Sequence, residues 1–392
     1  MMARWVSLVR QGPSRRGHIA AGCISGFNRL KSFSKPFVLN LALQGGGAHG
    51  AFTWGVLDRL LEEPELDISG ISGASAGAVN AVALACGLAV GGKEGARAKL
   101  RKVWEGVHKA GVPDLMRLNP FLYSLSRNPT MTHMASLLSP YDFNPLGFDP
   151  LRRLLAETID FEVLRTSSGP DLIIAATEVS TGRPRFFRRA SLTIEQVLAS
   201  CCLPTLHHSV AIDGLAYWDG GFSSNPDIVS LAGESTAGDT LVVLVNPFEG
   251  DGVPTGAREI SGHANRLTFN APFLRDVEVI ETAREAMAGF FRPRRGRLVN
   301  LARHRFHLIE AGRYTSTLSH DSKMKPDRSL LDFLHGAGRT EAREWLDRHR
   351  ADVGHRATVD LKERFLERPR SRAPEAAPPA EQQARLARGA GG

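Results

Sequence analysis

Cysteine is scarce in this sequence, with only four among 392 residues. None of the four has the spacing of a metal-binding motif, so neither a metal nor another cofactor is expected from them. Two of them, Cys201 and Cys202, are neighbours in the chain and cannot easily bridge each other. The scarcity excludes a disulfide-rich secreted domain and predicts thiols that stay reduced in a reducing compartment.

Long apolar runs and early acidic residues are also missing. No run approaches the roughly 20 apolar residues that a membrane-spanning helix needs. The first acidic residue is Asp58, and the only charged side chains before it belong to Arg and Lys. The apolar stretch 19–24 is too short for a signal peptide, so residues 1–36 are expected to form a flexible basic arm.

The whole chain is basic, with a net charge of +8 and a pI of about 9.6. A basic arm can lie on an anionic membrane surface, and residues 292–297 hold a second basic cluster that can do the same. Basic patches can equally meet nucleic acid, but the sequence holds no recognised nucleic-acid motif. We therefore expect a cytoplasmic protein that can associate peripherally with membranes and that does not bind nucleic acid.

What is present is the pattern of one large α/β domain, with 42% hydrophobic and 23% charged residues. An apolar run over 37–43 ends in a glycine-rich loop, and a helix that stops before Pro64 follows it. A second apolar run over 66–71 ends in a tight turn, which leads into a helix of small residues over 78–85. Strand, helix and strand in this order predict a parallel sheet.

Later segments extend this domain to about residue 350, with core motifs in 37–247 and a helical extension after them. The region 111–150 is too long for a plain connection and is expected to form a lid, a pocket wall or an irregular packed insertion. Residues 368–392 are rich in Pro, Ala, Arg and Glu, which predicts a disordered tail. The other predicted elements are strands over 171–178 and 240–246, hairpins over 171–188 and 209–218, helices over 93–108, 151–157, 193–202, 257–291 and 340–349, and a segment, 297–309, that fits either type.

The tight turn after the second apolar run reads Gly73-Ala74-Ser75-Ala76-Gly77, a G-x-S-x-G pattern. A strand before it and a helix after it are the context in which this pattern marks a nucleophilic serine on an exposed elbow. The glycines let the backbone pass close, and the helix N-terminus favours developing negative charge. We therefore predict Ser75 as a nucleophile; the structural alternative is a small-residue turn that packs a helix on the sheet.

Three consecutive glycines, Gly45, Gly46 and Gly47, follow the first strand, and their N–H groups are candidate donors to an oxyanion. The N–H of Ala76, directly after the serine, is a further candidate. The same loop, continued to Gly50, also matches the G-x-G-x-x-G pattern of dinucleotide sites. That pattern requires an acidic residue at the end of the second strand, where the serine turn lies instead, so a dinucleotide cofactor is not expected.

A nucleophilic serine needs a base, and the most distinctive acidic site after it is Asp219-Gly220-Gly221, which follows a predicted strand. No later histidine lies in a comparable glycine-rich loop, so Asp219 alone is a candidate base. Partial burial would raise the pKa of its carboxyl group toward the working range. A Ser–Asp–His hydrolase that uses a later histidine such as His263 stays open at this point.

Three motifs, residues 45–50, 73–77 and 219–221, occur in the order found in the patatin-like phospholipase family, which this chain resembles over roughly 37–247. Segments between the second and third motif also look like bacterial members of that family. The resemblance implies a three-layer α/β fold with a mainly parallel sheet, Ser75 and Asp219 as a dyad, and the glycine loop as the oxyanion hole. The chain departs from the family at His49, where members usually have Arg or Lys, and we expect this His to orient the loop.

The resemblance also implies a serine-dependent lipid acyl hydrolase, which cleaves acyl esters of phospholipids or other lipids through an acyl-enzyme and without calcium. Its partner would be the lipid substrate, and neither a metal nor a cofactor would take part. A catalytically inactive lipid-binding protein is the alternative outside enzymes. The glycines that would support the motifs are Gly50, Gly73, Gly77, Gly220 and Gly221.

Overall fold

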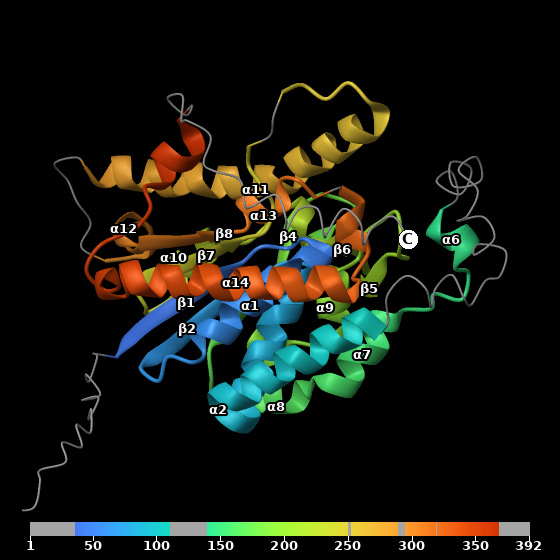
Figure 1. Ribbon diagram of the computed structural model, residues 1–392, viewed down its shortest axis with the longest axis horizontal. Coiled ribbons are helices and arrows are strands. Elements are labelled where there is room, and N and C mark those ends of the chain that lie inside the picture. Colours follow the sequence, from blue (N-terminus) through green and yellow to red (C-terminus); the bar gives the residue numbers. More distant parts are fainter. Residues whose placement is uncertain (1–35, 110–138, 250–251, 289–294, 319, 368–392) are drawn as a thin grey trace, which may run out of the picture. The chain divides into compact units, whose positions relative to one another are not determined.

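A mostly parallel β-sheet forms the centre of the protein in this computed structural model, which describes residues 36–109, 139–249, 252–288, 295–318 and 320–367 (Figure 1). The predicted basic arm, apart from its last residue, and the predicted tail lie outside the described residues. So does most of the predicted lid region, because residues 110–138 are not described.

The sheet has eight strands in the order β5-β6-β3-β2-β1-β7-β8, and β4 pairs with β3 off this path. Five strands are parallel to one another: β1 (Phe37–Leu43), β2 (Leu66–Gly73), β3 (Asp171–Glu178), β7 (Asp239–Leu244) and β8 (Arg305–Glu310). Three pair antiparallel at one side: β4 (Pro184–Arg188), β5 (Val210–Ile212) and β6 (Leu215–Asp219).

The register of the central strands decides where the predicted motifs meet. Leu43 at the end of β1 lies opposite Gly73 at the end of β2 and opposite Val243 of β7. The carboxyl ends of parallel strands share one edge of the sheet, where ligand sites of open α/β folds are found. The glycine loop after β1 and the serine turn after β2 are therefore neighbours at that edge.

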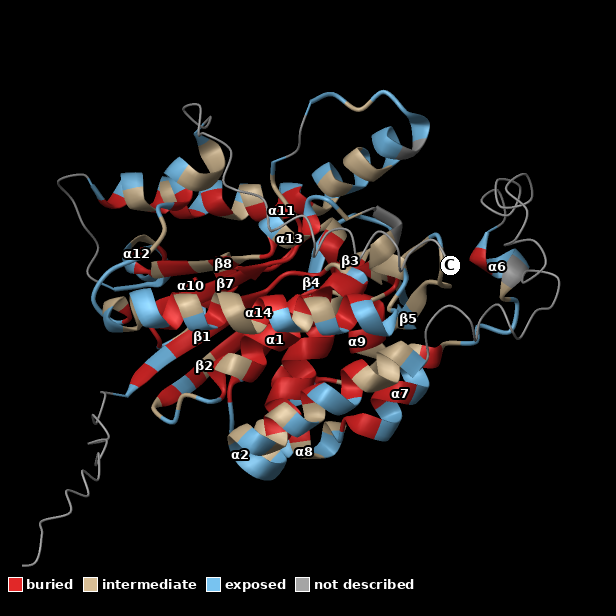
Figure 2. Ribbon diagram, viewed as in Figure 1, coloured by how far each residue is buried: buried red, intermediate tan, exposed pale blue. Residues whose placement is uncertain are grey.

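Helices cover both faces of the sheet and make three layers. Alternate residues of β1 and β7 enter two separate apolar cores: Leu41 and Val243 enter one, Ala42 and Val242 the other. Figure 2 shows the buried strands between the two layers. The first core is covered by α1 (Gly50–Leu60), α2 (Ala76–Lys109), α7 (Pro150–Thr158), α8 (Phe161–Thr166), α9 (Ile194–Ser200) and α14 (Arg328–His349), and the second by α10 (Val229–Glu234), α11 (Ala257–Met287) and α12 (Arg297–Arg303).

Most predicted elements are confirmed, and the differences have local causes. The helices expected over 78–85 and 93–108 form one run, α2, whose regular path is broken only at Gly91 and Gly92. The ambiguous segment 297–309 divides into α12 and β8. The last helix was predicted too short: α14 begins at Arg328, after an N-cap in which Asp327 accepts the N–H of Leu330.

One described helix, α2, is long and apolar enough to cross a membrane by length and composition, with a mean hydropathy of 1.4 over its most apolar part. The expectation that no segment would meet this criterion was therefore wrong. That part of α2 is 67% buried inside the protein, where it packs in the first core. Helices in the core of a large α/β domain carry the same apolar composition, so α2 is explained by its packing.

Two carboxyl groups lie close together where the start of α10 packs on α11: Asp227 is buried just before α10, and Asp276 is half-buried on α11. Asp276 Oδ2 accepts the N–H of Ile228 at 3.1 Å, and burial together with the charge of Asp227 raises the pKa of Asp276 to about 7. A raised carboxyl pKa means that the folded state holds a proton that the unfolded chain releases near pH 4. The stabilisation that this proton provides is present below about pH 4 and is lost as the pH rises through about 7.

We predict that Asp276→Asn raises the thermal unfolding midpoint by several degrees at pH 8 and by little at pH 4, because the amide cannot ionise. Unfolding followed by circular dichroism at both pH values measures this. Asp347→Asn, at an exposed aspartate of α14, is the matched control and should change neither midpoint. Equal shifts at pH 4 and pH 8 for Asp276→Asn would contradict the protonation argument.

Candidate active site

Ser75 lies on a strained elbow between β2 and α2. Its φ is +53°, in the left-handed region that non-glycine residues seldom adopt. Its N–H lies within hydrogen-bond distance of two acceptors of Ser200 at the end of α9, the carbonyl oxygen at 3.1 Å and Oγ at 3.0 Å. Ser75 is only partly buried and directly precedes the N-terminus of α2, so its hydroxyl can reach a ligand near a partial positive charge.

The predicted supporting glycines lie where the backbone passes too close to a neighbour for a side chain. A Cβ built at Gly77 would collide with the carbonyl oxygen of Leu43, and one at Gly220 with the carbonyl oxygen of Ala175. The elbow can therefore approach the end of β1, and the Asp219 turn the middle of β3, only with glycine at these positions. Positions at which an added Cβ would come within 3.0 Å of another atom include Gly50, Gly73, Gly77, Gly220 and Gly221.

The glycine loop touches the serine turn, since a Cβ built at Gly45 would lie 2.7 Å from the Cβ of Ser75. The N–H of Gly45 does not point to a free site, because it donates to Asn225 Oδ1 at 2.8 Å. Gly45 was predicted as an oxyanion donor, but its N–H is already engaged by Asn225. Its lack of a side chain instead lets the loop lie close to Ser75. Within the described part of the chain, the N–H groups of Gly46, Gly47 and Ala76 have no hydrogen-bond acceptor.

Three amide side chains that sequence reasoning missed hold this loop in place. Gln44 Oε1 accepts the N–H groups of Val245 and Asn246 at 2.8 Å each, which ties the loop to the end of β7. Asn246 Nδ2 donates to the carbonyl oxygen of Gly45 at 3.2 Å, and Asn225 holds the N–H of the same residue. Asn225 is 180 positions away from Gly45, so no pattern within the loop could have pointed to it.

His49 lies in the turn η1 (Gly47–His49) that follows the glycine loop. Its ring is buried, and Nε2 lies 2.8 Å from the hydroxyl of Ser322 in the short helix η4 (His320–Met324). This hydrogen bond connects the loop to a segment far along the chain. The contact agrees with the expectation that His49 orients the loop.

Asp219 ends β6 and is completely buried. Its Oδ1 accepts the N–H of Gly221 at 2.7 Å, and its own N–H donates to the carbonyl oxygen of Cys202 at 2.7 Å. Oδ2 is buried without a partner of ordinary hydrogen-bond geometry among the described residues. The hydroxyl of Ser75 still lies near enough to lower the pKa of the carboxyl group, so the two side chains face each other in a loose contact.

Burial dominates the ionisation of Asp219. It raises the pKa of the carboxyl group to about 7, against the lowering effects of the Ser75 side chain and the Gly221 N–H. A carboxylate with a pKa near neutrality is a much stronger base than an aspartate in water. The arrangement thus places a partly exposed hydroxyl beside a carboxylate that can accept its proton near pH 7.

No histidine takes part in this contact as far as the described residues show, because neither oxygen of Asp219 accepts a hydrogen bond from an imidazole. His263, the candidate in a Ser–Asp–His arrangement, lies on α11 with Nδ1 2.9 Å from Arg266 Nη2. Two other late histidines are engaged in the sheet: His304 with Thr240 and His307 with Asp239 and Thr358.

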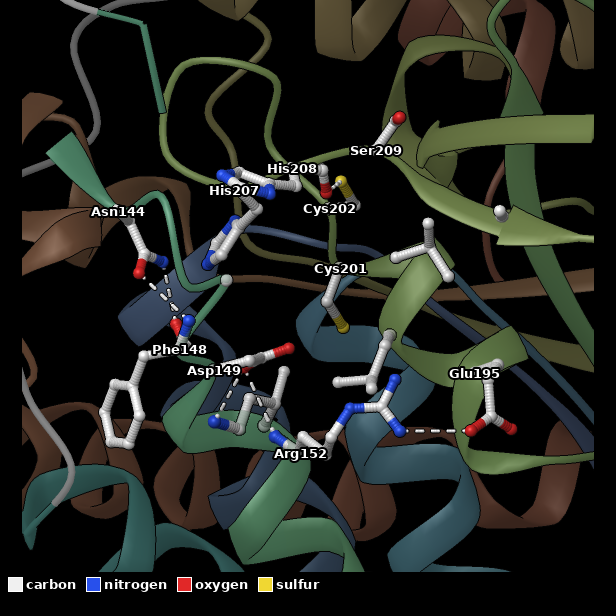
Figure 3. A pocket seen from close by; sticks show the side chains of 15 residues that line it. Asn144, Phe148, Asp149, Arg152, Glu195, Cys201, Cys202, His207, His208 and Ser209 are labelled. Atoms are coloured by element: carbon white, nitrogen blue, oxygen red, sulfur yellow. Dashed lines mark hydrogen bonds and ion pairs between the residues drawn. The ribbon is translucent and has the colours of Figure 1, made fainter. Parts of the chain in front are cut away.

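A cavity of about 270 Å³ lies beside the Asp219 turn, between α7, α9 and β5. Figure 3 shows Asn144, Phe148 and Asp149 along one side of it and Cys201 and Cys202 along another. Burial raises the pKa of the Cys202 thiol to about 12 and the pKa of Cys201 well above its usual value, so both thiols stay protonated. The lining also holds an ion pair, Arg152–Glu195 at 3.0 Å, so this is not the continuous apolar wall that a long acyl chain prefers.

The described part of the chain holds no group of three or more His, Cys, Asp or Glu side chains that could bind a metal ion.

Comparison with known proteins bears directly on the three motifs. Residues 41–232 match the family model described as patatin-like phospholipase. This stretch is a patatin-like phospholipase domain. It contains the glycine loop, the serine elbow and Asp219, and it places the chain among lipid acyl hydrolases at the level of the family. The matched stretch thus includes every residue of the predicted dyad and oxyanion hole, whereas the alternative candidate His263 lies outside it.

The remaining comparisons add little to this assignment. Among solved structures, the crystal structure of VipD from Legionella pneumophila matches with 14% identity and a TM-score of 0.36, covering 85% of this chain and 73% of that chain. So distant a likeness carries no argument about the function of this chain. A comparison with curated proteins finds no match.

Proposed function

We propose that the patatin-like domain hydrolyses lipid acyl esters with Ser75 as the nucleophile and Asp219 as its base. The observation that carries this proposal is the completely buried carboxylate of Asp219 facing the hydroxyl of the strained Ser75 elbow. The match of residues 41–232 to the patatin-like phospholipase model supports a lipid ester as the substrate class.

In this mechanism Asp219 takes the proton of Ser75 while Oγ attacks the ester carbonyl carbon. The N–H groups of Gly46, Gly47 and Ala76 would donate to the oxyanion that forms, and the N-terminus of α2 would stabilise the same charge. Collapse of this intermediate breaks the ester bond, and the proton held by Asp219 leaves with the alcohol. A water molecule then attacks the acyl-enzyme, Asp219 accepts its proton, and the fatty acid leaves as Ser75 regains its own proton.

The catalytic unit would extend through the helical region up to about residue 350. Helix α14 packs in the same core as α1, whose N-terminus follows the glycine loop. The segment just before α14 carries Ser322, which is hydrogen-bonded to His49. A protein shortened after residue 247 would therefore lose contacts to the loop that carries the proposed oxyanion donors.

The test of this function is release of fatty acid from a chain-length series of p-nitrophenyl esters and from defined phospholipids. We expect turnover of both substrate types by the full chain and covalent labelling of Ser75 by an alkyl fluorophosphonate, located by mass spectrometry of the labelled peptide. Labelling at another residue would contradict the nucleophile. Lipid binding with neither turnover nor labelling would favour an inactive lipid-binding protein.

A further inference from the structure

Two cationic side chains, Lys323 and Arg266, come from distant parts of the chain to the rim of the proposed active site. Lys323 lies in η4, and its main chain packs so tightly on the loop that a Cβ built at Gly47 would collide with the Lys323 carbonyl oxygen. The Cβ of Lys323 would lie only 3.4 Å from that added atom. The side chain of Lys323 therefore starts directly beside Gly47, a proposed oxyanion donor.

Arg266 reaches the same rim from α11. Three and four residues later on this helix, Phe269 and Asn270 contact the site: a Cβ at Gly221 would lie 2.5 Å from the Phe269 ring, and Asn270 Oδ1 is 3.4 Å from Gln44 Nε2. Residues at this spacing share one face of a helix, so Arg266 lies on the face of α11 that looks onto the site.

Neither cation is neutralised among the described side chains. Among the described side chains, no carboxylate acts on Lys323, and burial together with the charge of Arg266 lowers the pKa of Lys323 to about 8. Arg266 contacts His263 through Nη2, but its Nε is buried without a hydrogen-bond partner in the described part of the chain. Two positive charges that lie close together and are partly removed from water destabilise the folded protein unless an anion binds beside them.

We propose that Lys323 and Arg266 form a subsite for the phosphate group of a phospholipid substrate, next to the glycine loop that would hold its ester. This inference rests on the proposed function and adds a headgroup contact to it. Arginine and lysine side chains bind phosphate oxygens through charge-assisted hydrogen bonds, and the unused Nε–H of Arg266 is a donor of this kind.

Exposed apolar residues on the approach to Arg266 favour a lipid over a free phosphate ion as the source of the anion. Leu267 is 58% exposed and Ile260 is 49% exposed on the same helix, and Val253 just before it is 88% exposed. Apolar side chains that project from a surface beside cationic ones are the combination that binds anionic lipid interfaces. A site for small ions alone would gain nothing from them.

The test compares two substrates with the same acyl chains, dihexanoylphosphatidylglycerol and the uncharged dihexanoylglycerol. Lys323→Met and Arg266→Met are each expected to lower the ratio of kcat/KM on the phospholipid to kcat/KM on the neutral ester about tenfold or more. This is the loss that one charge-assisted hydrogen bond predicts. Lys325→Met removes the same charge from an exposed lysine two residues further on and should leave the ratio unchanged.

Equal losses on both substrates, or no change in the ratio, would overturn the subsite while leaving the proposed hydrolase intact. If the wild-type chain turns over neither substrate, the proposed function fails, and the subsite is judged by binding alone. Calorimetric titration of the full-length Ser75→Ala protein with dihexanoylphosphatidylglycerol should then show binding that Lys323→Met weakens at least tenfold. Binding of inorganic phosphate without the phospholipid, or of neither, would overturn the headgroup assignment.

Discussion

Ser75→Ala is expected to lower kcat/KM for acyl esters by about 10³-fold or more, up to the roughly 10⁶-fold loss seen when a hydrolase loses its nucleophile. The hydroxyl is the only group at the elbow that can form the acyl-enzyme, so no neighbouring side chain can replace it. The cysteines nearby cannot, because burial raises the pKa of both the Cys201 and the Cys202 thiol. Residual turnover would come from the oxyanion donors and substrate binding alone.

The fold should survive this change, because the contacts that hold the elbow are made by the main chain of residue 75 with Ser200. We would measure hydrolysis of p-nitrophenyl butyrate and the thermal unfolding midpoint of the same preparation. Ser168→Ala, at an exposed serine in the loop before β3, is the control and should change neither. More than a tenth of wild-type activity in Ser75→Ala would show that the nucleophile lies elsewhere.

Asp219→Asn is expected to reduce kcat/KM by about 10²- to 10⁴-fold, the contribution that a positioned general base usually makes. The amide has the same shape, and its oxygen can still accept the N–H of Gly221 that Oδ1 accepts now. What it loses is the ability to take the proton of Ser75. In the wild type, kcat/KM should rise with pH through a midpoint near 7, because burial raises the pKa of Asp219 to about 7 and only the carboxylate is a base.

The same substitution should stabilise the protein at alkaline pH. Since the folded-state pKa of Asp219 is raised, its protonated form stabilises the fold below about pH 4, and this stabilisation is lost as the pH rises through about 7. An inactive Asp219→Asn protein with a higher unfolding midpoint at pH 8 than the wild type would show that the buried carboxylate needed for catalysis lowers the stability of the fold.

Asp213→Asn is the matched control for this variant, because Asp213 is an exposed aspartate at the turn of the same hairpin. Its φ of +50° suits asparagine as well as aspartate, so its activity, pH profile and stability should stay those of the wild type. Near-full activity of Asp219→Asn would place the base at another residue and return the histidines to consideration.

Local patterns in the sequence were enough to predict the strands and turns that carry the site. The apolar run 37–43 and the run 171–178 become β1 and β3 with the predicted bounds, because strands buried on both faces are continuous apolar runs. The serine elbow could also be recognised, since its strand, small-residue turn and helix are consecutive in the chain. Hairpin β5–β6 was readable from its turn at Asp213 and Gly214 for the same reason.

Only the tertiary structure decided how these pieces act together. It assigned the N–H of Gly45 to Asn225, which removes one of the expected oxyanion donors, and it fixed the complete burial that raises the pKa of Asp219. It also brought Lys323 and Arg266 to the same rim. Each of these features depends on contacts between residues far apart in the chain, which form when the two apolar cores pack against the sheet. Spacing and residue type describe neighbours along the chain, whereas hydrogen-bond partners, burial and the pKa that follows from it belong to neighbours in space.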